Sequence, residues 1–153
     1  MKILKITIWV VLALFVILQF IPNTYPENKK SNEHDLMLTG DVPEEVGLIL
    51  KNSCYDCHSN ETRYPWYAYI APVSWLVVRD VKLGRAELNF SEWDNLKSRD
   101  KIKLLDEIVE EVEDENMPMP IYTITHGDAA LDDNKKQLLA EWTENMMNDI
   151  LGE

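Results

Sequence analysis

Two cysteines and a histidine stand together in the string Cys54-Tyr-Asp-Cys57-His58, and the chain has no other cysteine. Two thiols three positions apart on a turn are spaced to form thioether bonds with the two vinyl groups at one edge of a haem macrocycle. The next residue is then placed to bind the iron through its imidazole. The C-x-x-C-H pattern therefore predicts one covalently attached haem c, with His58 as the proximal iron ligand.

Other uses of a C-x-x-C pair fit this sequence less well. A thioredoxin-like redox pair needs a βαβ context, and no strand pattern is present. A structural zinc site takes four ligands, but His34, His58 and His126 are joined by no second C-x-x-C and no H-x-x-x-H. A disulfide across two residues closes too small a loop to add much stability. A plain thiol pair in a structural module without haem remains as an alternative.

The N-terminal segment places Lys2 and Lys5 before an apolar run from Ile6 to Ile21. This is the composition of an export signal, and as a helix with its flanks the run approaches the ~30 Å thickness of a bilayer core. No A-x-A-like cleavage pattern follows, which favours an uncleaved anchor. We expect residues 1–22 to form a signal anchor and a single transmembrane helix. The lysines would stay in the cytoplasm and the rest of the chain would lie in the periplasm or another extracytoplasmic space.

The remaining chain divides into two parts. Residues 23–41 are polar, contain Pro26 and show no helical or strand period, so we expect a tether. Residues 42–153 are expected to form one all-α, cytochrome-c-like domain around the haem. Helical apolar spacing and capping residues predict helices from Pro43 to Cys54, from Val73 to about Gly84, after Ser91, over 102–112, and from Asp132 or Asp133 onward.

The balance of charge excludes one class of partner. The chain has 15 Lys and Arg against 27 Asp and Glu, a net charge of −12, which is the wrong sign for binding nucleic acid phosphates. The two lysines before the apolar run stay behind at the membrane, so the exported part has 13 basic and 27 acidic residues, a net charge of −14. Such a surface favours a basic docking face on a redox partner protein of the periplasm or membrane.

The second axial ligand is expected in the string Met117-Pro-Met119-Pro, because methionine and histidine are the usual partners opposite a proximal histidine. The prolines stiffen this loop and can hold a methionine against the iron. Met117 is the predicted distal ligand, with Met119 and His126 as alternatives and His34 a weaker one. Both methionines would otherwise be core-filling residues.

Further motifs follow the cysteines at intervals. They are an N-x-T-x-x-P-W-Y block at 60–67, A-P-V-S-W at 71–75, G-R at 84–85, F-S-x-W at 90–93 and a methionine-proline segment ending in Tyr122 and His126. With these motifs the chain from about Pro43 to Trp142 resembles the bacterial haem-binding domain family of monohaem, c-type cytochrome-like proteins. Met119 stands where the family pattern has a second proline, which leaves Met117 at the family methionine and adds a second thioether nearby.

The resemblance implies one haem in a helical fold and a methionine ligand in the proline-rich turn. By analogy with small bacterial cytochromes c, the helix ending at Cys54 should cross the last helix near Trp142. The sequence favours a membrane-anchored, extracytoplasmic carrier of single electrons over a catalyst. The alternative is a haem-based sensor or peroxidase-like enzyme with a labile sixth ligand, in which His126 or Tyr122 would line the distal pocket.

Overall fold

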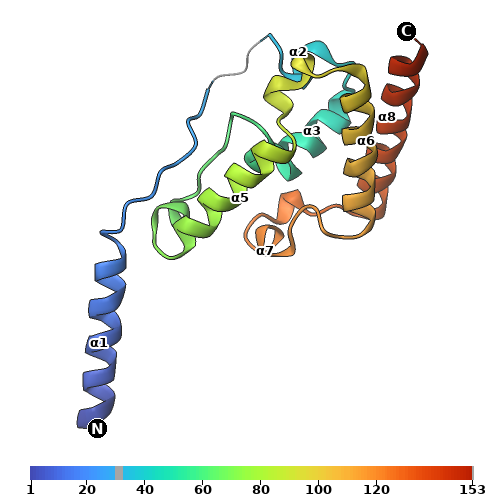
Figure 1. The fold of residues 1–153 in the computed structure, drawn as a ribbon. Coiled ribbons are helices and arrows are strands. Elements are labelled where there is room, and N and C mark those ends of the chain that lie inside the picture. Colours follow the sequence, from blue (N-terminus) through green and yellow to red (C-terminus); the bar gives the residue numbers. More distant parts are fainter. Residues whose placement is uncertain (30–32, 153) are drawn as a thin grey trace.

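The computed structural model describes residues 1–29 and 33–152, and all regular structure in these ranges is helical. The expected all-α fold is confirmed for this part of the chain. Figure 1 shows the path. The helices are α1 (Lys2–Leu18), α2 (Leu36–Thr39), α3 (Glu44–Ser53), α4 (Tyr55–His58), α5 (Val73–Glu87), α6 (Ser98–Glu113), α7 (Pro120–Thr123) and α8 (Asp133–Gly152), with 3-10 turns η1 (Trp66–Tyr69), η2 (Phe90–Asn95) and η3 (Gly127–Ala129).

The core lies where α6 packs against α8 and α8 packs against α3 (Figure 1). Leu50, Leu105 and Leu139 are almost fully buried there, and burying each such side chain contributes about 1.5–3 kcal/mol. Trp142 of α8 belongs to the same apolar cluster as Leu50 of α3. Helices α3 and α8 are in contact, as the resemblance led us to expect, and the position of their crossing along α8 stays a prediction.

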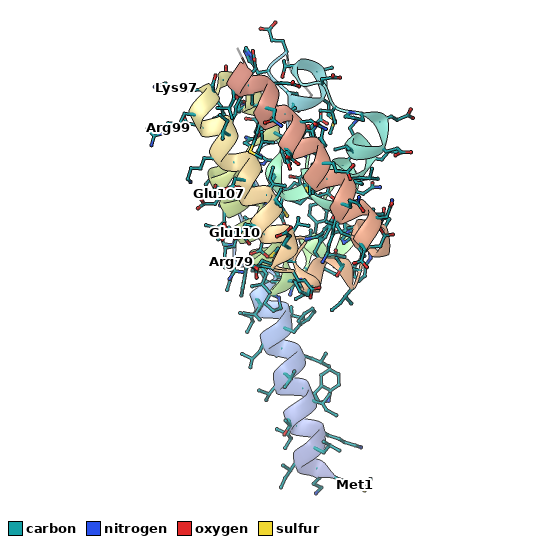
Figure 2. The ribbon with its side chains drawn as sticks, turned by 90° about the vertical axis from the view of Figure 1, so that its right-hand side faces the viewer. Met1, Arg79, Lys97, Arg99, Glu107 and Glu110 are labelled. Carbon is teal, nitrogen blue, oxygen red and sulfur yellow. The ribbon has the colours of Figure 1, made fainter. Side chains whose placement is uncertain are left out.

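Helix α1 projects away from the domain, and none of its residues is buried (Figures 1 and 2). It has 17 residues, which at a rise of ~1.5 Å per residue is shorter than a ~30 Å bilayer core. Among the described residues, no helix has the length and apolar character needed to cross a membrane. The transmembrane helix expected over residues 1–22 is thus not found. The helix ends before Gln19, whose amide donates to the Phe15 carbonyl and to the Ala71 carbonyl of the domain.

The segment expected as a tether is packed on the domain wherever it is described. Tyr25 donates from its hydroxyl to the Ala68 carbonyl at 2.7 Å, and the Lys29 amide donates to the Asn60 carbonyl at 2.9 Å. Further along, Leu36 is fully buried in the core. Residues 30–32 of this expected tether lie outside the described residues. The sequence pattern misses the packing of residues 23–29 because their hydrogen bonds are made by polar side chains and backbone groups, which leave no period.

Two helix boundaries differ from expectation. Helix α5 continues to Glu87 instead of ending at Gly84. The short helix after residue 89 is η2, and it is capped by the Asn89 side chain, which accepts from the Ser91 amide. The Ser91 hydroxyl instead donates to the buried carboxylate of Asp35 at 3.0 Å. The sequence predicts Ser91 as the capping residue, whereas in the structure its hydroxyl makes a long-range hydrogen bond.

Candidate functional site

The C-x-x-C-H residues occupy one turn at the junction of α3 and α4. The chain bends at Cys54, which has non-helical backbone angles, and the amides of Cys57 and His58 both donate to the Cys54 carbonyl at 3.1 and 2.9 Å. The turn thus holds both thiols and the imidazole in one compact unit. Both cysteines are free thiols and half-buried.

Burial keeps both thiols neutral. Desolvation, followed by the charge of Cys57, raises the pKa of Cys54 to about 12. Desolvation, followed by the charges of Asp56 and Asp80, raises the pKa of Cys57 to about 11. Thioether formation adds an S–H bond across a vinyl group, so two protonated thiols three positions apart match the chemistry of haem attachment. These residues fit a covalent haem.

His58 is oriented by the chain that follows α5. Its Nδ1 lies 3.1 Å from the carbonyl oxygen of Leu88. Burial lowers the pKa of His58, an effect opposed by the backbone carbonyl contacts, so the imidazole is neutral at neutral pH. When Nδ1–H donates to Leu88, the lone pair is on Nε2, which is the arrangement that fixes the ring of a metal-binding histidine. The edge of the ring also faces Phe90, with centroids 6.4 Å apart.

Gly84 lets α5 approach the motif closely. A β-carbon at this position would lie 2.8 Å from the Cys57 carbonyl oxygen and 3.1 Å from the Cys57 β-carbon. The backbone of α4 cannot yield at such a distance without moving the attachment turn. The glycine of the sequence motif G-R is therefore needed for helix packing, which explains why it does not end α5.

We expect Gly84→Ala to cost about 1–3 kcal/mol in free energy of unfolding, because it overpacks the contact between α4 and α5. It should also lower the yield of haem-loaded chain. Gly127→Ala is the matched control, since its β-carbon would meet no atom within 4 Å. Urea unfolding of both variants measures the difference, and an unchanged midpoint for Gly84→Ala would contradict the close approach.

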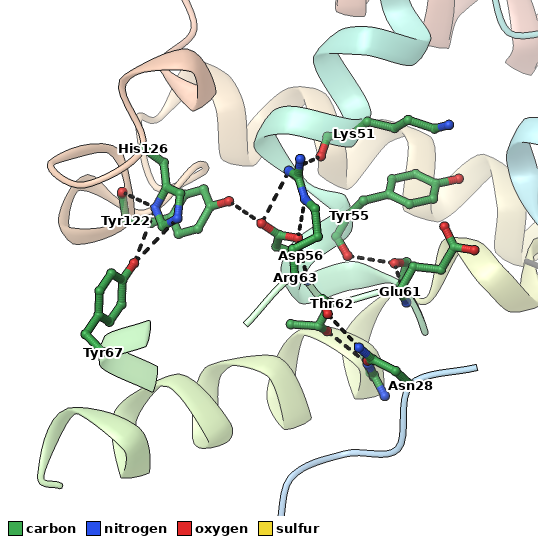
Figure 3. Close-up of polar contacts among 12 residues, drawn as sticks. Asn28, Lys51, Tyr55, Asp56, Glu61, Thr62, Arg63, Tyr67, Tyr122 and His126 are labelled. Carbon is green, nitrogen blue, oxygen red and sulfur yellow. Dashed lines mark hydrogen bonds and ion pairs between the residues drawn. The ribbon is translucent and has the colours of Figure 1, made fainter. Parts of the chain in front are cut away.

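Asp56, between the two cysteines, connects the motif to the loop beyond α6 (Figure 3). Asp56 is only 7% exposed. It accepts from the Arg63 amide at 3.0 Å and from Arg63 Nε at 3.1 Å. The Tyr122 hydroxyl donates to the other oxygen at 2.7 Å. Helix α7 is therefore tied to the attachment turn by a hydrogen bond between residues 66 positions apart.

His126 lies on the far side of Tyr122 (Figure 3). The two rings stack with centroids 4.1 Å apart and an angle of 16°, and the Tyr67 hydroxyl lies 3.5 Å from the imidazole nitrogens. The structure thus joins Cys54, Cys57 and His58, through Asp56, to Tyr122 and His126. Met117 and Met119 are half-buried in the loop leading into α7. His34 lies apart from this network, with Nδ1 3.7 Å from Asp94.

Sequence reasoning missed Asp56 as a site residue. The available signal was an acidic residue between the two cysteines of the motif, because a carboxylate inside the attachment turn is taken out of water and a buried charge needs partners. Arg63 and Tyr122 supply them, and Arg63 also donates to the Lys51 carbonyl at 3.1 Å. The position of the acid in the motif indicates a link to other elements, but it does not say which residues make the link.

The thiols predict a pH dependence specific to the haem-free chain. In the folded state their pKa values are raised above the ordinary 9.0, so their stabilising contribution is complete below pH 9 and is lost as the pH rises towards 11 to 12. In the haem-loaded chain the sulfurs are thioethers and do not titrate. Urea midpoints measured at pH 8 and pH 10 should therefore fall more for the haem-free form. An equal fall in both forms would contradict this assignment.

The described residues bring together no group of three or more His, Cys, Asp or Glu side chains that could hold a metal ion. The chain has no significant match among curated proteins and none among solved structures. The family model described as the haem-binding domain matches residues 13–145, a range that includes the C-x-x-C-H turn, Gly84, Asp56 and Tyr122. The chain therefore belongs to the haem-binding domain family.

Proposed function

We propose that this protein is a monohaem, c-type cytochrome-like carrier of single electrons that works outside the cytoplasm and is attached to a membrane through its N-terminal segment. The observation that supports this most is the attachment turn. It presents two free, protonated thiols and a neutral imidazole oriented by the Leu88 carbonyl, within a domain of a haem-binding family.

The residues of the chain divide the work between attachment and positioning. Cys54 and Cys57 would form the two thioether bonds, and His58 would bind the iron through Nε2. Bound haem supplies one-electron redox chemistry at its iron. The aromatic side chains of Tyr55 and Phe90, stacked with centroids 5.2 Å apart beside the turn, exclude water from this part of the domain.

The Asp56–Tyr122 hydrogen bond ties α7, which follows the loop of Met117 and Met119, to the attachment turn. The bond fixes the start of the segment that follows Met117 and Met119. The loop can therefore hold the sulfur of a methionine for the iron, although neither methionine lies in a helix. A methionine held by this loop would bind the haem iron together with His58, and the fold would hold both side chains in place during the transfer of one electron. Met117 is the proposed ligand because it stands at the methionine position of the family motif.

Electrons would be exchanged with a protein whose docking face is basic. Helix α6 ends in an exposed acidic run, Glu110, Glu111 and Glu113, followed by Asp114 and Glu115, and the exported part carries a net charge of −14. Complementary charge raises the association rate, and salt weakens it.

Membrane attachment is supported by the exposed apolar side chains of α1, which include Trp9, Leu12 and Phe15. A contiguous apolar surface of this kind is unusual on a monomer in water. Lys2 and Lys5, followed by the apolar run from Ile6 to Ile21, are typical of an export segment. Membrane fractionation and the mass of the mature N-terminus test this part of the proposal.

Expression with a haem-attachment system tests the redox proposal. We expect the mass of the chain to rise by one haem, a low-spin ferric spectrum, and reversible reduction by one electron. A high-spin ferric spectrum with binding of carbon monoxide to the reduced form would instead support a sensor or peroxidase-like enzyme. The gathering of Tyr67, Tyr122 and His126 near the turn is the observation that favours this second function.

A further inference from the structure

The end of the domain nearest α1 exposes large apolar side chains from three separate segments. They are strongly exposed, with Trp66 at 76% and Ile124 at 81%. We define the apolar face by Phe20, Ile21, Trp66, Tyr69, Ile121 and Ile124. Single exposed apolar residues are ordinary on a protein surface, whereas a group that gathers at one end marks a contact surface.

Hydrogen bonds join the segments that carry these side chains. The Tyr67 hydroxyl lies 3.0 Å from Thr125 Oγ1, which joins η1 to the segment containing Ile121 and Ile124. At the other side, Gln19 and Ala71 exchange two hydrogen bonds of 3.1 and 3.0 Å, which join the end of α1 to the start of α5. In Figure 1, the green turn η1 and the orange helix α7 lie at the end of the domain from which α1 projects.

The domain cannot swing freely about the end of α1, because the following residues are bonded to it. Asn23 donates to the Ser74 carbonyl at 2.9 Å, and Tyr25 donates to the Ala68 carbonyl at 2.7 Å. The Tyr25 ring also packs on Tyr64 and Tyr69, with centroids 5.3 and 5.5 Å apart. Insertion of α1 into lipid therefore brings the apolar face to the membrane surface.

The side chains of the apolar face and the charge of the domain indicate what the face contacts. Tryptophan and tyrosine favour the boundary between headgroups and acyl chains, where the ring is in an apolar environment and the polar atom stays wet. The net charge of −14 on the part beyond the two N-terminal lysines opposes attraction to anionic headgroups. Binding must therefore come from apolar contact with the bilayer interface.

We propose that the apolar face contacts the lipid interface directly and seats the domain on the membrane in one orientation, with the loop of Met117 to His126 on the membrane side. This inference rests on the membrane attachment proposed above. It places electron exchange at the plane of the bilayer, where membrane-bound redox proteins are met by lateral diffusion.

Cysteine accessibility in vesicles tests the orientation. In the haem-loaded full-length chain the native sulfurs are thioethers, so an introduced cysteine is the one reactive thiol. Trp66→Cys and Ile124→Cys are placed on the face, and Arg99→Cys is the control at the opposite end of the domain (Figure 2). Each protein is reconstituted in phosphatidylcholine vesicles and labelled with a charged, membrane-impermeant maleimide. Each labelling rate is divided by the rate measured for the same variant unfolded in urea, so that the ratio reports the accessibility of the thiol.

Both face positions should react at least about tenfold more slowly than Arg99→Cys, because side chains buried at the interface are removed from the aqueous reagent. Replacing part of the phosphatidylcholine by phosphatidylglycerol should not increase this protection. Protection that requires the anionic lipid would overturn the proposal, as would face rates within about twofold of the control.

Vesicle flotation of the same samples separates the two levels of the proposal. A chain that floats with the vesicles while its face positions react as fast as Arg99→Cys would retain membrane attachment and overturn the seated orientation. A chain that does not float would overturn both. The haem spectrum, recorded on every variant, shows that the domain is folded. Because Trp66 and Ile124 are largely exposed, their substitution should leave this spectrum unchanged.

Discussion

A chain carrying both Cys54→Ala and Cys57→Ala is expected to lose all covalently bound haem. The two sulfurs are the chain's only thiols, so no other side chain can form the thioether bonds. Each single variant should retain at most one bond and accumulate less holoprotein. The measurement is the mass of the purified chain under denaturing conditions, which retain covalent haem and release any other. Lys51→Ala, an exposed position of α3, is the matched control.

Loss of the haem should also lower stability. A group that binds the native state and not the unfolded one stabilises the fold, and a covalent link keeps that group at the site. The double variant should therefore unfold at a lower urea concentration than the haem-loaded chain. Haem mass that persists in the double variant would contradict the assignment of both cysteines. A wild-type chain that acquires no haem mass would instead favour a plain thiol pair.

The elements with strong periodicity could be predicted from the sequence. Helix α6 repeats apolar residues at spacings of three and four, with buried Leu105 and Val112 on its core side. Helix α3 begins directly after Pro43 and runs into the attachment turn. Both follow from local chemistry, because an amphipathic stripe and a capping residue are visible within a short window.

The contacts that hold the site together could not be predicted in this way. Asp35 accepts from Tyr55 at 2.9 Å and from Ser91 at 3.0 Å while it is 1% exposed. Asp56 likewise depends on Tyr122. In each case a buried carboxylate is stabilised by hydroxyl donors far away in the chain, and no spacing rule relates such partners. Burial implied that partners exist, and the tertiary fold determined which ones they are.

The same reason explains the packed segment after α1. Its composition is typical of a tether, because Asn23, Tyr25 and Asn28 are polar and prolines lie among them. In the structure these side chains donate to backbone carbonyls of residues 62–74. Polar composition predicts exposure, whereas the hydrogen-bonding capacity of the same residues lets the segment bind the surface of the domain.

Met117→Ala is expected to convert the low-spin ferric spectrum to a high-spin one and to lower the midpoint potential. A thioether ligand stabilises the reduced iron, and axial ligands tune haem potentials over ~0.8 V, so we expect a fall on the order of 0.1 V. The matched control is Met119→Ala, two residues away in the same half-buried loop. It should keep the low-spin spectrum. The ferric absorption spectrum and a potentiometric titration of both variants provide the measurement.

The outcome also decides among the alternative ligands. His126 is held by stacking on Tyr122, and its Nδ1 lies 3.1 Å from the Tyr122 carbonyl, which leaves Nε2 as the nitrogen available to bind iron. A low-spin spectrum that persists in Met117→Ala and disappears in Met119→Ala would move the ligand to Met119. If it disappears only in His126→Ala, the distal ligand is the imidazole and the potential of the wild type should be correspondingly low. A wild type that is already high-spin would remove the sixth ligand from the proposal and favour the sensor or peroxidase-like function, because an open iron position is what such chemistry requires.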